Sequence, residues 1–424
     1  MATDMTTALP MLKVFYEGIE AKRILYKNRP LFAMIPKREN VGGSSVPVPV
    51  IYNNSQNRSS TVSGGAFSGA STFGSVTFQV TTKTVYGGGS ISNQAIKASK
   101  TNAMAFVDLL TEAIDRALDN AGQNIATQIA RSGTGSVAQI ASTATINSAS
   151  TYVALANPDD IVNLAVDMNI AASQTDGGSL RAYASTGCYI VKIDRPNGSF
   201  LCSATMGGSP AALNSLLTSV AVGDYIYQNA SDLNAFYSGI PGWIAGSAVT
   251  SSSFYGVDRT VDKSRLAGIT FDGSGLSMQD AIYKAAAIVT REGGRADKLF
   301  LNYADYTNLQ AELRGNQVFF TPTNVMSEDP RLNLSFSAIA LAGPAGTIHV
   351  MLDPYVPTGK GYLLQMDSWE LVSVGPPVEL FNGDGLDMLR DSTGDLLNFR
   401  ITGYGNILCK QPGFNAIITF NVGS

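Results

Sequence analysis

The sequence contains few charged residues. Only 15% of its 424 residues are charged, against an average of about 25% in soluble proteins. Since charge protects a protein surface against association, this scarcity favours a chain that buries much of its surface against other subunits. The formal net charge of −4 argues against a dedicated nucleic-acid-binding protein, for which a concentrated basic face would be expected.

Cysteines and long apolar runs are also scarce. Cys188, Cys202 and Cys409 are too few for a disulfide framework in a chain of this length, which favours a reducing compartment over secretion. No stretch of 18 apolar residues occurs, and the first residues lack a basic segment followed by an apolar run, so neither a membrane span nor a secretory signal is predicted. We therefore expect a soluble protein, made in the cytoplasm, from which no propeptide has been removed.

The residues that catalysis or metal binding would require are isolated. His349 is the only histidine and lies in "GTIHVML", a strand pattern in which a structural role is expected. The segment "PYVPTGKG" departs from a phosphate-binding loop, because Pro354 replaces the first glycine and Gly361 replaces the Ser or Thr. The acidic stretch "NGDGLDMLRD" lacks the spacing of a calcium loop. The sequence therefore predicts no enzyme, no cofactor and no metal site.

The first hundred residues contain a long and almost uncharged hairpin. Between Val46 and Val50 three valines alternate with two prolines, which predicts an edge strand with one apolar face. A second alternating pattern begins at Val76. The polar segment between them, from Asn53 to Thr72, is longer than most loops of compact domains. We predict a protruding ribbon whose only charged residue is Arg58.

The first 41 residues form the most basic segment of the chain. Seven Lys or Arg residues oppose four Asp or Glu residues, so the net charge is 7 − 4 = +3. A solvated surface arm and an arm that meets a polyanion or a partner subunit both remain open.

One long helix is predicted from Thr101 to Ala130. Its apolar residues recur at steps of three and four, as expected of one helical face. They are Val107, Leu110, Ile114, Ala117, Leu118, Ala121, Ile125 and Ile129. About thirty residues at 1.5 Å each give a rod of roughly 45 Å. A helix that lies on a sheet is favoured over a coiled coil, because the second half is rich in small residues and lacks a strict leucine repeat.

The pattern then changes twice along the chain. From Gly135 to Thr250 short strands and turn signals predict a β-rich inserted domain, with a hairpin in "CYIVKIDRPNGSFLCSA", a short helix capped by Asn157 and a turn in "GIPGWI". From Ser251 onward a mixed pattern predicts a helix in "SMQDAIYKAAAIVTREGG", with Ser277 and Asp280 placed to cap its start, and another in "DKLFLNYADYTNLQAELRGN". Pairs of long strands, "TIHVMLDPYVPTGKGYLLQMDSWELVSVG" and "LLNFRITGYGNILCKQPGFNAIITF", end the chain.

This order of elements resembles that of the major capsid proteins of tailed bacteriophages, the Hong Kong 97-type fold. The features that carry the resemblance are the basic arm, the uncharged hairpin, the 30-residue helix closed by "RSGTG", and the α/β region with its long closing strands. It covers roughly Met1 to Gly135 and Ser251 to Ser424. No single motif is specific, so the resemblance depends on the order and character of the elements.

The resemblance implies an α+β fold in five parts. These are an N-terminal arm (1–41), an extended loop formed by the β-hairpin (42–92), a peripheral domain with a spine helix (93–135), a β-rich inserted domain (136–250), and an axial domain with the remaining peripheral strands (251–424). The ribbon between Gly42 and Thr82 contains no lysine, which argues against covalent cross-linking through a ribbon lysine. No scaffolding extension precedes the arm, so a scaffold would be a separate protein.

The implied function is structural. Hexamers and pentamers would form an icosahedral shell around double-stranded DNA, as a virion protein assembled in the host cytoplasm without membrane contact. Portal, scaffold and decoration or cement proteins are the implied partners besides other copies. The candidate intersubunit contacts are Val46, Val48, Val50, Arg58, Phe67, Phe73, Val76 and Phe78. The candidate DNA-facing residues are Lys13, Lys22, Arg23, Lys27 and Arg29.

The sequence leaves two alternative functions open. An encapsulin-type bacterial compartment would share the fold but enclose a cargo protein. Another β-rich virion, tail or surface-layer protein is the third interpretation, which the long helix disfavours because such proteins consist mainly of sheet.

Overall fold

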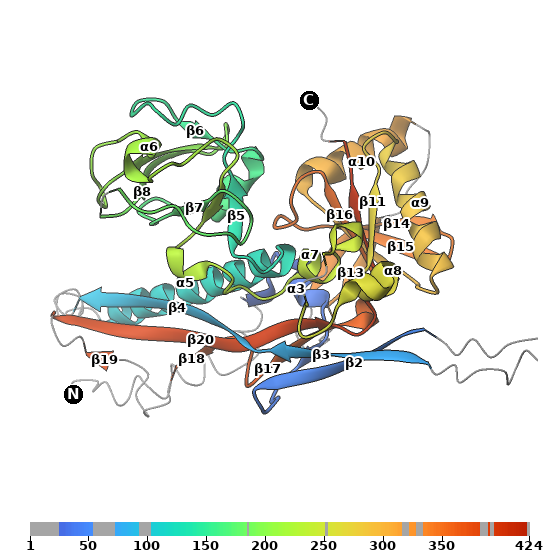
Figure 1. Cartoon of the computed structure of the whole chain (residues 1–424). Helices are drawn as coiled ribbons and strands as arrows, with labels where there is room; N and C mark the ends of the chain where they lie inside the picture. Colours follow the sequence, from blue (N-terminus) through green and yellow to red (C-terminus); the bar gives the residue numbers. More distant parts are fainter. Residues whose placement is uncertain are drawn as a thin grey trace, which may run out of the picture.

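The computed structural model describes most of the chain. The described residues are 25–53, 73–92, 103–184, 186–250, 253–315, 322–327, 334–381, 389–390 and 394–421. A body with two large sheets carries a smaller unit on one side, shown in green in Figure 1. We call this smaller part the second unit.

A two-stranded ribbon confirms the predicted hairpin. Strand β2 (Ser45–Asn53) pairs antiparallel with β3 (Gly74–Thr81), and the register places Val48 opposite Phe78. The apolar residues of both strands therefore share one face, as a period of two requires. Among the described residues β2 has no other neighbour, which confirms the predicted edge strand. The next strand, β4 (Lys83–Ser92), pairs with β20 instead, so the paired ribbon ends at Thr81, before the predicted residue 92.

The long helix lies on a six-stranded sheet. Helix α5 (Ala103–Ala130) confirms the predicted rod and packs Ala117 and Ala121 against Phe399 and Ile401 of the sheet. Gly89 makes room for this contact, because a Cβ there would lie 2.6 Å from the Phe399 ring. The strands of this sheet are β1 (Lys37–Arg38), β17 (Trp369–Ser373), β20 (Leu396–Cys409), β18 (Glu379–Leu380), β4 and β19 (Leu389–Arg390).

A seven-stranded mixed sheet forms the other half of the body. Helices α9 (Met278–Arg291) and α10 (Tyr303–Gly315) pack on it, and Ser277 caps α9 by accepting the Asp280 N–H at 3.2 Å, as predicted. The long closing strands of the sequence are divided between the two sheets. The strands of this sheet, in order, are β11 (Ile269–Asp272), β21 (Ala416–Thr419), β16 (Lys360–Leu364), β12 (Lys298–Leu301), β15 (Gly346–Leu352), β14 (Ser335–Gly343) and β13 (Pro322–Met326).

The second unit has a hydrophobic core of its own, built from residues between Val137 and Phe236. The predicted hairpin is confirmed, and Asn157 caps a short 3₁₀ helix, η2 (Pro158–Asn163). Two three-stranded sheets and helix α6 (Leu213–Leu216) surround the core. The strands are β5 (Ser136–Gln139), β10 (Tyr225–Tyr227) and β7 (Ala171–Ser173) in one sheet, and β6 (Val153–Ala154), β9 (Ser199–Ser203) and β8 (Tyr189–Asp194) in the other.

The chain returns to the body before the predicted boundary at residue 250. The predicted turn in "GIPGWI" is a short helix, α7 (Ile240–Trp243), and the fully buried Trp243 belongs to the body core. The start and end of the second unit are adjacent, because Asn234 N–H donates to the Thr134 carbonyl at 2.7 Å. The remaining short helices are α3 (Pro30–Met34), η3 (Ala230–Asp232), η4 (Gly246–Ala248), η5 (Arg259–Asp262), α8 (Lys263–Ala267), η7 (Met366–Ser368) and η8 (Pro412–Phe414).

Candidate assembly surfaces

The inner face of the ribbon packs against the chain's own body. Phe78 is fully buried, and its ring lies 5.2 Å from that of Trp243 in an edge-to-face arrangement. The three valines of β2 are between 3% and 7% exposed and belong to the same core. Each such side chain contributes about 1.5 to 3 kcal/mol when fully buried. The inner face is therefore part of the monomer.

Hydrogen bonds fix this part of the ribbon in place. Asn406 Nδ2 donates to the Thr81 carbonyl at 2.7 Å, and Arg265 Nη1 donates to the Tyr52 carbonyl at 2.6 Å. The Gln79 N–H donates to the Tyr255 carbonyl at 3.0 Å. Each of these bonds joins the ribbon to a different segment of the body, so the direction in which the ribbon leaves the body is determined.

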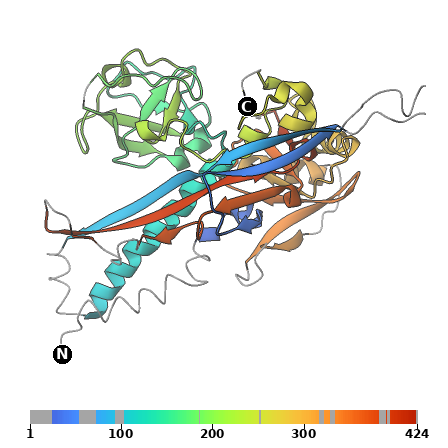
Figure 2. The ribbon, with the colours of Figure 1, turned by 60° about the horizontal axis from the view of Figure 1, so that its bottom comes forward.

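The outer face of the ribbon is exposed and uncharged. Pro47, Pro49 and Thr77 point away from the body. Towards the far end, Ile51 and Phe73 are 64% and 62% exposed. The ribbon and β4 extend in opposite directions from the middle of the body (Figures 1 and 2). The outer face is thus free to contact another molecule at a distance from the chain's own sheets.

The first described residues of the arm are anchored rather than free. The Arg29 side chain is buried and donates to Asp119 Oδ1 at 2.7 Å and to the Leu25 carbonyl at 2.9 Å. This bond to α5 holds the arm against the long helix. Lys27, in contrast, is exposed.

A buried carboxylate attaches the same segment to the body. Asp353 Oδ2 accepts the Leu31 N–H and Oδ1 accepts the Tyr355 N–H, both at 2.9 Å. Burial raises the pKa of Asp353 to about 6, although both N–H donors and the charge of Arg29 act in the opposite direction. Asp353 lies 322 residues after Leu31 in the chain, and no signal in the sequence connects the two.

The second unit meets the body at polar contacts around η2. Arg131 Nη2 and Asp160 Oδ1 form an ion pair at 2.5 Å, and Thr358 Oγ1 donates to Asp159 Oδ2 at 2.5 Å. Burial raises the pKa of Asp160 despite its partner. A cleft of about 480 Å³ lies beside these contacts. It is lined by Asp159, Val162, Asn302, Tyr303, Ala304, Thr307, Asn308 and Pro354.

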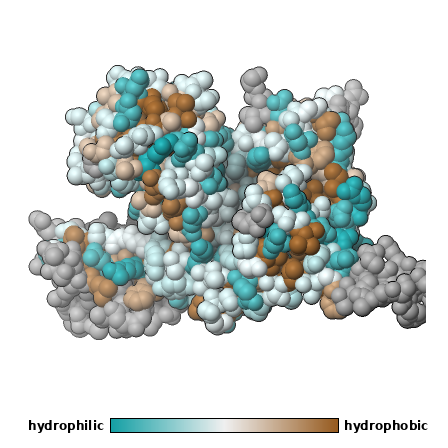
Figure 3. Space-filling view, viewed as in Figure 1, coloured by the Kyte–Doolittle hydropathy of each residue, from teal (hydrophilic) through white to brown (hydrophobic). Residues whose placement is uncertain are grey.

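The exposed surface agrees with the low charge of the sequence. On the face shown in Figure 3, pale residues that are neither strongly polar nor strongly apolar cover much of the second unit and the body. In the part of the chain that the structure describes, no helix is long and apolar enough to cross a membrane.

Comparison with known proteins was made by sequence and by structure. No family model and no curated protein matches the sequence. Among solved structures, a chain of the cyanophage A-1(L) capsid asymmetric unit aligns over 92% of each chain, with a TM-score of 0.50 and 10% identity. The chain has a phage capsid fold. The predicted resemblance is thus confirmed at the level of the fold.

Two further structures align less well. The capsid of an empty GTA particle has a TM-score of 0.43 and 9% identity over 93% of this chain and 90% of that one. The SrpI encapsulin complex of Synechococcus elongatus PCC 7942 has a TM-score of 0.42 and 7% identity over 92% and 86%. The fold assignment depends on the cyanophage structure, and the division of the capsid fold into five parts stays a prediction.

The candidate contact residues separate into three groups on the capsid fold. Four of them, Val46, Val48, Val50 and Phe78, are buried in the chain's own core and leave no side-chain surface for a neighbour. Phe73 is exposed and Val76 is half-buried. Arg58 and Phe67 lie outside the described residues. The period of two distinguished the two faces of the ribbon correctly, but it could not tell which face meets the chain's own body.

The candidate DNA-facing residues of the capsid fold require one correction. Arg29 is buried and ion-paired with Asp119, so its charge is not available to DNA. Lys27 is exposed, and Lys13, Lys22 and Arg23 lie outside the described residues. Composition identified the segment as basic, but only tertiary structure shows that one of its cations is neutralised inside the protein.

The histidine and the three cysteines are all buried or half-buried within the described residues. His349 lies half-buried on β15, and its Nδ1 has no hydrogen-bond partner. All three cysteines are free and buried, and burial raises the pKa of Cys409 to about 12, which keeps it a thiol. Within the described ranges, no group of three or more His, Cys, Asp or Glu residues is placed to hold a metal ion.

Proposed function

We propose that this chain is a major capsid protein that assembles into hexamers and pentamers of an icosahedral shell around double-stranded DNA. The observation that carries the proposal is the ribbon, which joins a capsid fold to an exposed and uncharged outer face. A single copy offers this face nothing to pack on, whereas a neighbouring copy does.

Assembly would use contacts that are individually modest. The outer face of the ribbon and the surface of the next copy differ from each other, so the contact is heterologous and closes only when many copies surround an axis. A standard interface buries about 800 Å² on each partner. Since each copy makes several such contacts, weak pairs add up to a stable shell.

The remaining parts would take separate roles in the virion. Lys13, Lys22, Arg23 and Lys27 would face the packaged DNA through phosphate contacts that are independent of base sequence. The second unit would be an inserted domain on the face that carries α5. Portal, scaffold and decoration or cement proteins would complete a particle assembled in the host cytoplasm.

Deletion of Asn53–Thr72 tests the ribbon. We expect the isolated chain to keep its thermal stability, because the inner face of the ribbon is retained, but to form few or no particles. Negative-stain microscopy and light scattering would measure particle formation. The double substitution of Ile51→Ser and Phe73→Ser is the smaller version of the same test. Normal particles from the deletion would contradict the proposed role of the ribbon.

The contents and shape of the particles distinguish this function from the alternatives. Nuclease-protected double-stranded DNA inside closed shells supports the capsid, whereas a co-purifying cargo protein without DNA supports an encapsulin-type compartment. Tubes or flat lattices would point to a tail or surface-layer protein. Free monomers under all assembly conditions would contradict all three structural functions.

A further inference from the structure

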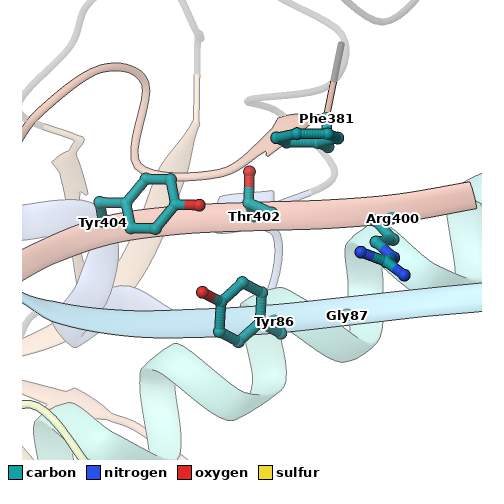
Figure 4. A pocket seen from close by; sticks show the side chains of 6 residues that line it. All are labelled: Tyr86, Gly87, Phe381, Arg400, Thr402 and Tyr404. Carbon is teal, nitrogen blue, oxygen red and sulfur yellow. The ribbon is translucent and has the colours of Figure 1, made fainter. Parts of the chain in front are cut away.

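A pocket opens on the sheet face opposite α5. Ile401 of β20 packs against α5, and because neighbouring residues of a strand point to opposite faces, Arg400 and Thr402 point away from the helix. Tyr86 of β4 lies opposite Thr402 in the register. The pocket has a volume of about 440 Å³, within the range of about 300 to 1,000 Å³ of ligand sites. Figure 4 shows its lining residues, Tyr86, Gly87, Phe381, Arg400, Thr402 and Tyr404.

Two polar groups of this pocket lack partners. The Thr402 side chain is only 3% exposed, and its Oγ1 lies near the Tyr404 phenol but meets no partner with good hydrogen-bond geometry within the described structure. In Figure 4 this hydroxyl points away from the strands, on the side of the sheet where Phe381 lies. Arg400 is exposed and forms no ion pair or side-chain hydrogen bond among the described residues. A buried hydroxyl without a partner is unfavourable, so an incoming acceptor would be favoured here.

Aromatic rings form the walls of the pocket. The rings of Tyr86 and Tyr404 meet edge to face, with centroids 6.4 Å apart, and Tyr86 is 62% exposed. Burial and the neighbouring Tyr86 phenol raise the pKa of Tyr404, while the Thr402 hydroxyl acts in the opposite direction. Tyr404 therefore keeps its proton at neutral pH and can donate a hydrogen bond.

We propose that this pocket binds a peptide segment of a separate protein partner, through an acidic side chain that lies next to an aromatic or aliphatic one. The guanidinium of Arg400 offers two parallel N–H donors to the carboxylate, a strong and directional arrangement. Thr402 and the phenols supply further donors. The rings of Tyr86 and Phe381 cover the neighbouring apolar side chain of the peptide.

The inference that the occupant is a separate protein, and not another copy of this chain, rests on the proposed shell. The ribbon of another copy is unsuitable, because the segment between Gly42 and Thr82 contains no carboxylate. The second unit of another copy is also unsuitable. It lies on the α5 side of the sheet (Figure 1), whereas the pocket opens on the opposite face, so in a single-layer shell the second unit of a neighbour cannot reach it. The charge of Arg400 then selects an acidic partner that approaches from that opposite face.

Titration of the full chain with the synthetic peptide acetyl-Phe-Glu-Phe-amide tests the proposal. Calorimetry or NMR should show saturable binding that weakens about tenfold or more in Arg400→Gln and when the peptide Glu is replaced by Gln. Thr402→Val should weaken binding several-fold without loss of stability, because it removes a buried hydroxyl that has no partner. Arg314→Gln, at an exposed arginine of α10, is the matched control and should change nothing.

Three results would overturn the proposal. They are equal binding of the Glu and Gln peptides, binding that is unaffected by Arg400→Gln, and no binding at millimolar peptide. Self-association that is lost in Arg400→Gln, without peptide binding, would assign the pocket to a second copy instead. Microscopy of the same samples separates the two proposals, because a chain that binds peptide but never forms shells contradicts the capsid function and leaves the pocket site standing.

Discussion

The largest hydrophobic core of the body and the core of the second unit are built from very different spans of sequence. The core of the second unit uses residues between Val137 and Phe236 only. The body core combines residues from Leu25 to Ile417, including the ribbon, the end of α5, Trp243 and the closing strands. The second core can form from one continuous segment, whereas the body core needs almost the whole chain. Contacts between distant residues fold more slowly, so we expect the second unit to fold first.

The contacts around η2 that join the second unit to the body are polar. The Arg131–Asp160 ion pair and the Thr358–Asp159 hydrogen bond are two of them, and Lys83 Nζ donates to the Asn234 carbonyl at 2.8 Å. The net contribution of a buried ion pair to stability is small, because the cost of removing both charges from water offsets their attraction, and a single hydrogen bond contributes about 1 kcal/mol. The comparison therefore predicts two units whose stabilities can be changed separately.

The largest expected effect on solubility depends on where a deletion of the second unit ends. Replacement of residues 136–236 by a short Gly-Ser linker should leave a soluble body that unfolds cooperatively, because Gly133 already lies against Tyr237 and Ser238. Extension of the deletion to residue 247 should give insoluble protein, because it also removes Trp243 from the body core. Solubility and thermal unfolding measure the difference, and equal behaviour of the two deletions would refute the boundary at Phe236.

A matched pair of core substitutions separates the two cores. Phe78 and Phe200 are both fully buried, one in the body and one in the second unit. Each substitution to Ala should cost about 3 to 5 kcal/mol, in the body alone for Phe78→Ala and in the second unit alone for Phe200→Ala. Hydrogen exchange followed by peptide mass would locate the loss. Loss of protection in both units from either substitution would show that the cores are coupled.

The smallest predicted effect is a pH dependence of the body. Because the pKa of Asp353 is raised from 3.8 to about 6, the folded body binds the extra proton between these values and loses stability as the pH rises through that window. The shift corresponds to about 3 kcal/mol. Asp353→Asn should flatten this dependence, measured by denaturation at pH 4 to 7. Asp167→Asn, at an exposed turn residue of the second unit, is the control, and an unchanged slope in Asp353→Asn would contradict the assignment.

Local patterns predicted the elements well. The alternation in β2 and β3, the apolar stripe of α5 and the cap at Ser277 all appear where the sequence placed them. These features depend on residues within a few positions of each other or on a period of the backbone itself. Where the ribbon and the second unit end depends on partners far away in the chain, because β4 pairs with β20 and Trp243 of α7 belongs to the body core.

The candidate site was predicted less well than the elements. The sequence proposed the ribbon as an intersubunit contact surface, but four of its proposed contact residues are buried in the body. Arg29 was counted among the arm's free cations, yet Asp119 neutralises it across ninety positions of sequence. The pocket around Arg400 and Thr402 had no signal in the sequence at all, since its walls come from β4, β20 and the residue after β18, which meet only in the folded sheet.

By itself the sequence determined which faces of this protein are apolar and which segments are uncharged, because periodicity and composition are properties of the chain before it folds. It also determined the order of elements that resembles a capsid protein. Only the tertiary structure decided which face of the ribbon packs on the body and which face is left exposed. It also decided which charges are paired inside the protein. Both depend on contacts between residues that are distant in sequence, and such residues come together only once the sheets have formed.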